Sequence, residues 1–123
     1  MSAGTLAAIG ALGGLGAIAR FLLDGAVAER WGRGFPYGTL VVNLLGSFVL
    51  GLAAGVALER DAYRVIATGL IGGFTTFSTW ALESQRLGED GRVAAAAANF
   101  AVSLALGIAC AWAGRRLGAT LLG

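Results

Sequence analysis

The chain has 123 residues, which is enough for one domain. Hydrophobic residues make up 57% of it and charged residues only 13%. A soluble domain of this size cannot bury so much apolar surface, so the composition indicates a protein that lies in a lipid bilayer. The net charge of +2 is too small to indicate a nucleic-acid partner.

Several kinds of catalytic site are excluded by the residue types that the chain lacks. It contains no histidine, so Ser-His-Asp triads and histidine-based zinc sites are unavailable. Its one cysteine, Cys110, excludes an internal disulfide and a cysteine-based zinc site. The sequence therefore predicts a protein that is not an enzyme.

Four apolar segments are long enough to cross a membrane, which takes roughly 20 mostly apolar residues. In chain order they are 3–23, 38–58, 65–82 and 93–113. The links between them hold nearly all the charged residues, and the only proline, Pro36, precedes the second segment. We therefore expect residues 1–123 to form one all-α transmembrane domain of four helices in a multi-pass protein of the cell membrane.

The basic residues, which are all arginines, are spread evenly over the two ends of the expected bundle. One end has Arg60, Arg64, Arg115 and Arg116, and the other has Arg30, Arg33, Arg86 and Arg92, with Arg20 leaning toward it. This balance gives the positive-inside rule almost nothing to act on. Either one strong helix or an insertion factor sets the orientation, or copies insert both ways round and pair antiparallel.

Glycines four residues apart allow helix backbones to approach closely. Such pairs occur at Gly10/Gly14, Gly51/Gly55 and Gly69/Gly73. They pack helices within one chain or line a contact between two copies. Because four thin helices cannot enclose much of a pathway, we expect a homodimer.

The third apolar segment contains residues that a membrane helix usually avoids. Two adjacent glycines, Gly72 and Gly73, weaken the helix, and hydroxyl residues follow at membrane depth. The aromatic residues Phe74, Phe77 and Trp80 recur at three-residue spacing among them. Irregular backbone at this depth is tolerated only where protein covers it or water lines it. The pattern predicts a third helix that is broken near its middle and forms the working segment of a transport protein.

Polar residues also recur on the second and fourth segments at four-residue steps. The second has Asn43 and Ser47 followed by glycines, and the fourth has Asn99, Ser103 and Gly107. Amides and hydroxyls in hydrocarbon need partners, so these side chains should face protein or water. They form either hydrogen bonds between helices or a ladder of donors along a permeation path.

No carboxylate lies in the middle of any predicted helix, because Asp24, Glu59 and Glu83 all fall at helix ends. A proton-coupled or cation-coupled transporter usually needs such a group, whereas amides, hydroxyls and aromatic ring edges suit a small anion. Arg20, embedded in the first segment, reaches the interface, pairs with Asp24, or supplies positive potential at a vestibule.

Three separated motifs together resemble the Fluc family of fluoride channels. They are GGLGAIARF at 13–21, VNLLGSF at 42–48 and GGFTTFSTW at 72–80, and Pro36–Gly38 and Asn99/Ser103 fit as well. The resemblance implies an antiparallel, dual-topology homodimer of a bacterial membrane with two pores. Through these pores fluoride leaves the cell passively, down its gradient.

The resemblance also implies roles for individual residues. Backbone carbonyls of Gly72 and Thr75 would hold a structural Na⁺ at the dimer centre, and Arg20 would lie at the vestibule. The predicted fluoride pore consists of Asn43, Phe77, Ser78, Thr79, Trp80, Asn99 and Ser103. Two of these depart from the family pattern: Trp80 replaces the usual phenylalanine, and Asn99 replaces a residue that is commonly tyrosine.

Two other functions remain open at this point. A small four-helix multidrug exporter would also have dual topology, but it needs a carboxylate within the first helix, which has none before Asp24. A membrane assembly subunit without a transport role would leave the polar interruption and the aromatic row unexplained.

Overall fold

A computed structural model of the chain describes residues 1–122, except for the side chain of Ser78. The first two helices are α1 (Ala3–Trp31) and α2 (Tyr37–Gly55), and the last is α6 (Val93–Leu122). Between them lie α3 (Arg60–Arg64), the π-helix η1 (Val65–Ile71), α4 (Gly72–Phe74) and α5 (Phe77–Glu89). Taken as one segment, Arg60–Glu89 joins the other three as a fourth helical stretch long and apolar enough to cross a membrane. The predicted all-α fold with four spans is therefore confirmed for the described residues.

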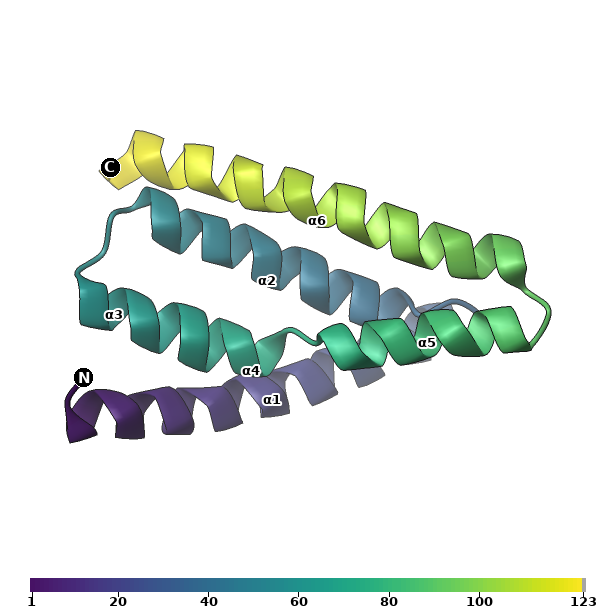
Figure 1. The fold of residues 1–123 in the computed structure, drawn as a ribbon, viewed down its shortest axis with the longest axis horizontal. Coiled ribbons are helices and arrows are strands. Elements are labelled where there is room, and N and C mark those ends of the chain that lie inside the picture. The colour runs from purple at the N-terminus through teal and green to yellow at the C-terminus, as the bar shows by residue number, and fades with distance from the viewer. Residues whose placement is uncertain (123) are drawn as a thin grey trace.

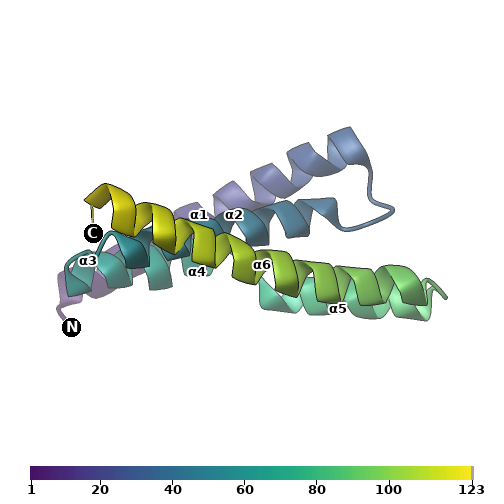
Figure 2. The same cartoon turned by 90° about the horizontal axis from the view of Figure 1, so that it is seen from above.

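The four spans lie lengthwise beside one another, and both chain termini are at the same end (Figure 1). Helix α2 packs most extensively against α6, while α1 packs against η1 and α4. Helix α5 packs mainly against α6. Seen from above, α5 and α6 stay together, while α1 and α2 diverge from them toward the end of the molecule opposite the two termini (Figure 2). The α4–α5 junction thus lies where the two groups of helices separate.

The helices begin and end at residues that hydropathy does not identify. Helix α1 continues past residue 23 to Trp31 and ends at Gly32, whose φ of 78° suits glycine. Helix α2 ends at Gly55, short of residue 58, because Ala57 adopts a φ of 60°. Hydropathy reports the apolar stretch, whereas local backbone geometry and capping set the helix ends.

Two of the predicted glycine pairs lie where helices of the same chain touch. A Cβ atom at Gly51 would overlap the carbonyl oxygen of Ala111 in α6, and one at Gly73 would overlap that of Gly13 in α1. These glycines therefore allow backbone contact between neighbouring spans. In contrast, apart from the surrounding turns of α1 itself, no atom of the described residues would lie within 4 Å of a Cβ atom at Gly10 or Gly14.

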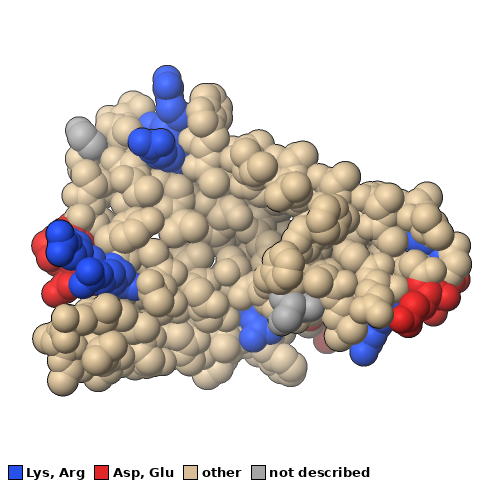
Figure 3. All heavy atoms as spheres, in the orientation of Figure 1, with Lys and Arg blue, Asp and Glu red and all other residues tan. Residues whose placement is uncertain are grey.

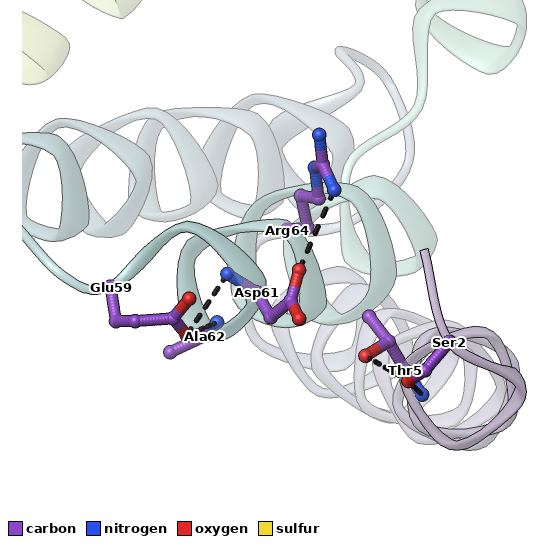
Figure 4. A network of polar contacts seen from close by, with 6 residues as sticks. All are labelled: Ser2, Thr5, Glu59, Asp61, Ala62 and Arg64. Atoms are coloured by element: carbon purple, nitrogen blue, oxygen red, sulfur yellow. Dashed lines mark hydrogen bonds and ion pairs between the residues drawn. The ribbon is translucent and has the colours of Figure 1, made fainter.

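Charged side chains gather mainly at the two ends of the molecule, and the surface between them is largely uncharged (Figure 3). At one end, the Glu59 carboxylate accepts hydrogen bonds from the backbone N–H groups of Asp61 and Ala62, at 3.0 and 3.2 Å (Figure 4). These bonds hold the pKa of Glu59 below its ordinary value and cap the start of the third span. The distribution is that of a protein whose middle lies in hydrocarbon.

Candidate functional site

A groove of about 410 Å³ lies between α2, the α4–α5 junction and α6. We call it the central groove, and its polar and aromatic lining consists of Asn43, Ser47, Thr75, Thr76, Phe77, Trp80 and Ser103. The remaining lining is apolar, including Leu50, Ile71 and Leu104. Ligand sites typically combine apolar walls with a few placed polar groups in this way.

The chain leaves helical geometry at Thr75 and Thr76, which join α4 to α5. Both residues are extended, with φ and ψ of −84° and 160° at Thr75 and −149° and 118° at Thr76. Gly46 on α2 makes room for this segment, since a Cβ atom there would overlap the Thr75 methyl group. Extended backbone at this depth needs new partners for its N–H and C=O groups.

Asn43 supplies those partners for Thr76. Its Nδ2 donates to the Thr76 carbonyl at 3.0 Å, and its Oδ1 accepts from the Thr76 N–H at 2.9 Å. One amide side chain thus satisfies both backbone groups of an extended residue. Asn43 is therefore a structural support of the groove wall as well as part of its lining.

The threonine hydroxyls satisfy other groups near the junction. Thr75 Oγ1 donates to the Ile71 carbonyl at 2.9 Å, and Thr76 Oγ1 accepts from the Thr79 N–H at 3.2 Å, capping α5. Thr76 Oγ1 also donates to Thr79 Oγ1 at 3.1 Å. Thr79 is therefore engaged in the cap, and it is not part of the groove lining.

Because the helix is interrupted at Thr75 and Thr76, the carbonyls of Gly72 and Thr75 lose the N–H partners that they would have in a continuous helix. The Gly72 carbonyl would accept from Thr76 and the Thr75 carbonyl from Thr79. Those N–H groups bond Asn43 Oδ1 and Thr76 Oγ1 instead. Oxygens displaced from their helical partners are the type of ligand that Na⁺ takes from unwound membrane helices.

Arg20 contacts the backbone carbonyl of Gly73, the residue after Gly72. Its Nε donates to the carbonyl of Gly73 at 3.4 Å, so the guanidinium of α1 lies beside the end of α4. An ion pair with Asp24, one of the three alternatives open for Arg20, is absent from the described residues, among which only Arg64 and Asp61 form such a pair. Arg20 is not part of the groove lining.

The two aromatic residues of α5 differ sharply in exposure. Phe77 is 73% exposed and Trp80 is 8% exposed, with their rings edge to face at 5.3 Å. Trp80 also stacks on Phe100 of α6, with ring centroids 4.9 Å apart, and its Nε1–H donates to the backbone carbonyl of Asn99 at 3.1 Å. The indole N–H is thus directed at α6, and Phe77 presents the accessible ring of the pair.

On α6, Ser103 and Asn99 occupy different positions although they lie one turn apart. Ser103 lines the groove, whereas Asn99 is only 1% exposed and lies behind it. Asn99 Nδ2 donates to Ser84 Oγ at 2.8 Å. Ser84 was not predicted from the sequence, because it lies beyond residue 82, where the third helix was expected to end, whereas α5 continues to Glu89. Its position one turn after Trp80 was the available signal.

The groove thus brings together four of the predicted pore residues, namely Asn43, Phe77, Trp80 and Ser103. Thr75, predicted as a Na⁺ ligand, also lines the groove. Two further predicted pore residues do not line it: Thr79 takes part in the cap of α5, and Asn99 is buried behind the groove wall. Ser78, the remaining one, lies outside the described side chains.

Comparison with known proteins places the chain in a family. The family model described as CrcB-like protein, Camphor Resistance (CrcB), matches residues 7–115. A Mycobacterium tuberculosis protein named Fluoride-specific ion channel FluC 2 is 53% identical over 104 residues, which cover 85% of this chain and 82% of the relative. The Fluoride-specific ion channel FluC of Geobacter metallireducens is 44% identical over 115 residues, covering 89% and 93%.

FluC 2 of Symbiobacterium thermophilum is 43% identical over 117 residues, which cover 91% of this chain and 95% of the relative. These similarities extend through all four spans and confirm the resemblance found in the motifs. The chain belongs to the CrcB-like protein family, among whose members are proteins named fluoride-specific ion channels.

Proposed function

We propose that the protein is a fluoride-selective channel that lets fluoride leave the cell passively and so reduces its toxicity. The observation that carries this proposal is the composition of the central groove. Its lining joins the exposed ring of Phe77 to the neutral polar side chains of Asn43 and Ser103, and none of its described residues is charged. The names of the relatives agree with this function.

The groove suits a small anion for physical reasons. Aromatic ring edges carry positive charge density, and amides and hydroxyls donate hydrogen bonds without a fixed charge. Several such weak donors replace the hydration shell of fluoride without trapping it, as conduction requires. A carboxylate would repel the anion, whereas a proton-coupled exporter would require one.

We also propose that the working protein is an antiparallel homodimer with two pores. In one chain the groove is open and Phe77 is 73% exposed, so a second copy would close it. The balanced arginines support insertion in both orientations, and the uncovered glycines Gly10 and Gly14 leave room for a close contact. The interruption at Thr75–Thr76 would then lie near the dimer centre.

Dual insertion predicts that a tag on the C-terminus will be accessible from both sides of the membrane. In intact cells, an impermeant reagent should label about half of the tags, because oppositely oriented copies pair one to one. The same labelling of permeabilised cells gives the total number of tags. Labelling of all tags or of none in intact cells would contradict the antiparallel dimer.

The carbonyls of Gly72 and Thr75 would hold a structural Na⁺ between the two copies. Their displaced helical partners support this assignment, because carbonyl oxygens of unwound helices are ligands for this ion. When bound, the ion would neutralise carbonyl dipoles of both interrupted helices and so stabilise their contact. Asn43 and Thr76 keep those carbonyls clear of their usual N–H groups.

Growth in fluoride tests the proposed function. Bacteria that lack their own fluoride export should grow at otherwise toxic fluoride concentrations when they express the chain. The vector alone is the control. Resistance to organic cations without resistance to fluoride would favour the exporter, and no resistance from a correctly inserted chain would contradict the channel.

A further inference from the structure

Asn99 is the most deeply buried polar side chain near the central groove. It is 1% exposed, and Val42 is the only other large side chain among the described residues that is buried to this degree. An amide in this environment costs free energy unless it has partners. Its partners therefore indicate what the residue does.

All of these partners lie on one turn of α5 and one turn of α6. Asn99 Nδ2 donates to Ser84 Oγ at 2.8 Å, and Ser84 Oγ donates to the Trp80 carbonyl at 3.0 Å. The Trp80 indole N–H donates in turn to the backbone carbonyl of Asn99 at 3.1 Å. The three hydrogen bonds form a closed circuit between the helices, which we call the α5–α6 brace (Trp80, Ser84 and Asn99).

The brace fixes the wall of the groove on which Phe77 lies. The Trp80 ring is held by its N–H bond and by stacking on Phe100, with an interplanar angle of 20°. Trp80 in turn meets Phe77 at 73°, edge to face. Any rotation of the indole therefore changes the surface against which the exposed Phe77 ring rests.

The brace also reaches a polar lining residue of the groove, Ser103. Ser103 Oγ donates to Asn99 Oδ1 at 3.5 Å, which is at the long limit of a hydrogen bond. This weak bond holds the hydroxyl at the groove while leaving its hydrogen easily recruited by an anion. Asn99 thus contacts both an aromatic support and a polar lining residue.

We propose that Asn99 is a positioning residue, which acts through Ser84, Trp80 and Ser103 and does not contact the transported anion. The inference rests on the proposed fluoride channel and assigns a different role to a residue first predicted to line the pore. It also explains the indole at position 80, because the phenylalanine usual there has no donor with which to close the circuit with α6.

Two variants remove hydrogen bonds of the α5–α6 brace, one by a change on each helix. Asn99→Leu replaces the amide by a branched side chain with the same number of heavy atoms, and Ser84→Ala removes one hydroxyl from α5. Each should lower fluoride efflux from liposomes by about tenfold, because Ser84→Ala leaves the buried Asn99 amide without its acceptor, and Asn99→Leu removes both the donor to Ser84 and the acceptor of Ser103. Each should also lower the ratio of fluoride to chloride efflux. Ser84→Thr keeps the hydroxyl and should restore both.

A spectroscopic measurement separates positioning from general damage. With Trp31→Phe and Trp112→Phe in every protein, Trp80 is the only tryptophan, and quenching of its fluorescence by acrylamide reports its accessibility. Asn99→Leu and Ser84→Ala should both raise quenching. The double variant should show no more quenching than Ser84→Ala alone, because the Asn99 amide reaches Trp80 only through Ser84.

Thr120→Ala is the matched control, since it deletes a hydroxyl-to-carbonyl bond of 2.8 Å on the exposed part of the same helix. It should leave efflux, selectivity and quenching unchanged. Lower efflux with unchanged quenching in Asn99→Leu would overturn the proposal, as would additive effects in the double variant. If the parent protein carried no fluoride, the channel would be refuted, and the quenching comparison would still decide whether the brace exists.

Discussion

Replacing Phe77 with isoleucine should lower fluoride efflux from liposomes by about tenfold or more. An aliphatic side chain of similar bulk has no electropositive edge, and favourable aromatic contacts are worth about 0.5–1.5 kcal/mol. Since Phe77 is 73% exposed in the single chain, its loss should not unfold the four-helix bundle. The variant should therefore purify with the same oligomeric size as the parent protein.

Phe21→Ile provides the matched control for this experiment. Phe21 is 76% exposed and lies on α1, outside the groove lining. It should conduct fluoride as the parent protein does. Normal efflux through Phe77→Ile would mean that the Phe77 ring only fills space.

Asn43→Leu should destabilise the protein more than any other change in the groove. The substitution leaves the N–H and the carbonyl of Thr76 without partners at membrane depth. Each buried group left unsatisfied costs about 1–3 kcal/mol. We expect a clear fall in the unfolding midpoint in detergent, together with loss of fluoride efflux, because Thr76 forms part of the groove wall.

Ser47→Ala, one turn along α2 and also in the groove, distinguishes this effect from a general loss of polarity. It removes a polar lining group but no bond to the backbone of Thr76, so the unfolding midpoint should stay near that of the parent. An Asn43→Leu protein as stable as Ser47→Ala would show that the two Asn43 bonds do not support the α4–α5 junction.

The spans could be predicted from sequence because apolar length alone decides whether a helix crosses a membrane. The residues at which the helices begin and end could not be predicted in this way. Helix α1 runs on to Trp31 through a more polar stretch, and α2 stops where Ala57 takes a positive φ. Both outcomes depend on local backbone geometry, which hydropathy does not measure.

Sequence periodicity identified residues of the groove but not their orientation. Asn43, Phe77 and Ser103 do line it, since polar and aromatic residues at membrane depth must face protein or water. Asn99 and Ser103 lie on the same face of α6, so spacing could not reveal that α5 covers only Asn99. That difference arises from the packing of two helices, as does the bond from the Trp80 indole to α6.

The glycine pairs illustrate the same limit. Spacing marked all three as places where backbones approach, yet it could not say which helix would lie opposite. The fold places Gly51 against α6 and Gly73 against α1, whereas Gly10 and Gly14 lie open. Of the three pairs, Gly10/Gly14 is the one left uncovered in the described chain, which is what the proposed dimer contact requires.

Anion efflux from liposomes containing the purified protein tests the central proposal most directly. Vesicles loaded with equal concentrations of potassium fluoride and potassium chloride are diluted into impermeant salt, and ion-selective electrodes follow both anions after valinomycin is added. A fluoride channel predicts rapid release of fluoride while chloride stays inside, as it does in protein-free vesicles. Equal release of both anions, or retention of both, would contradict it.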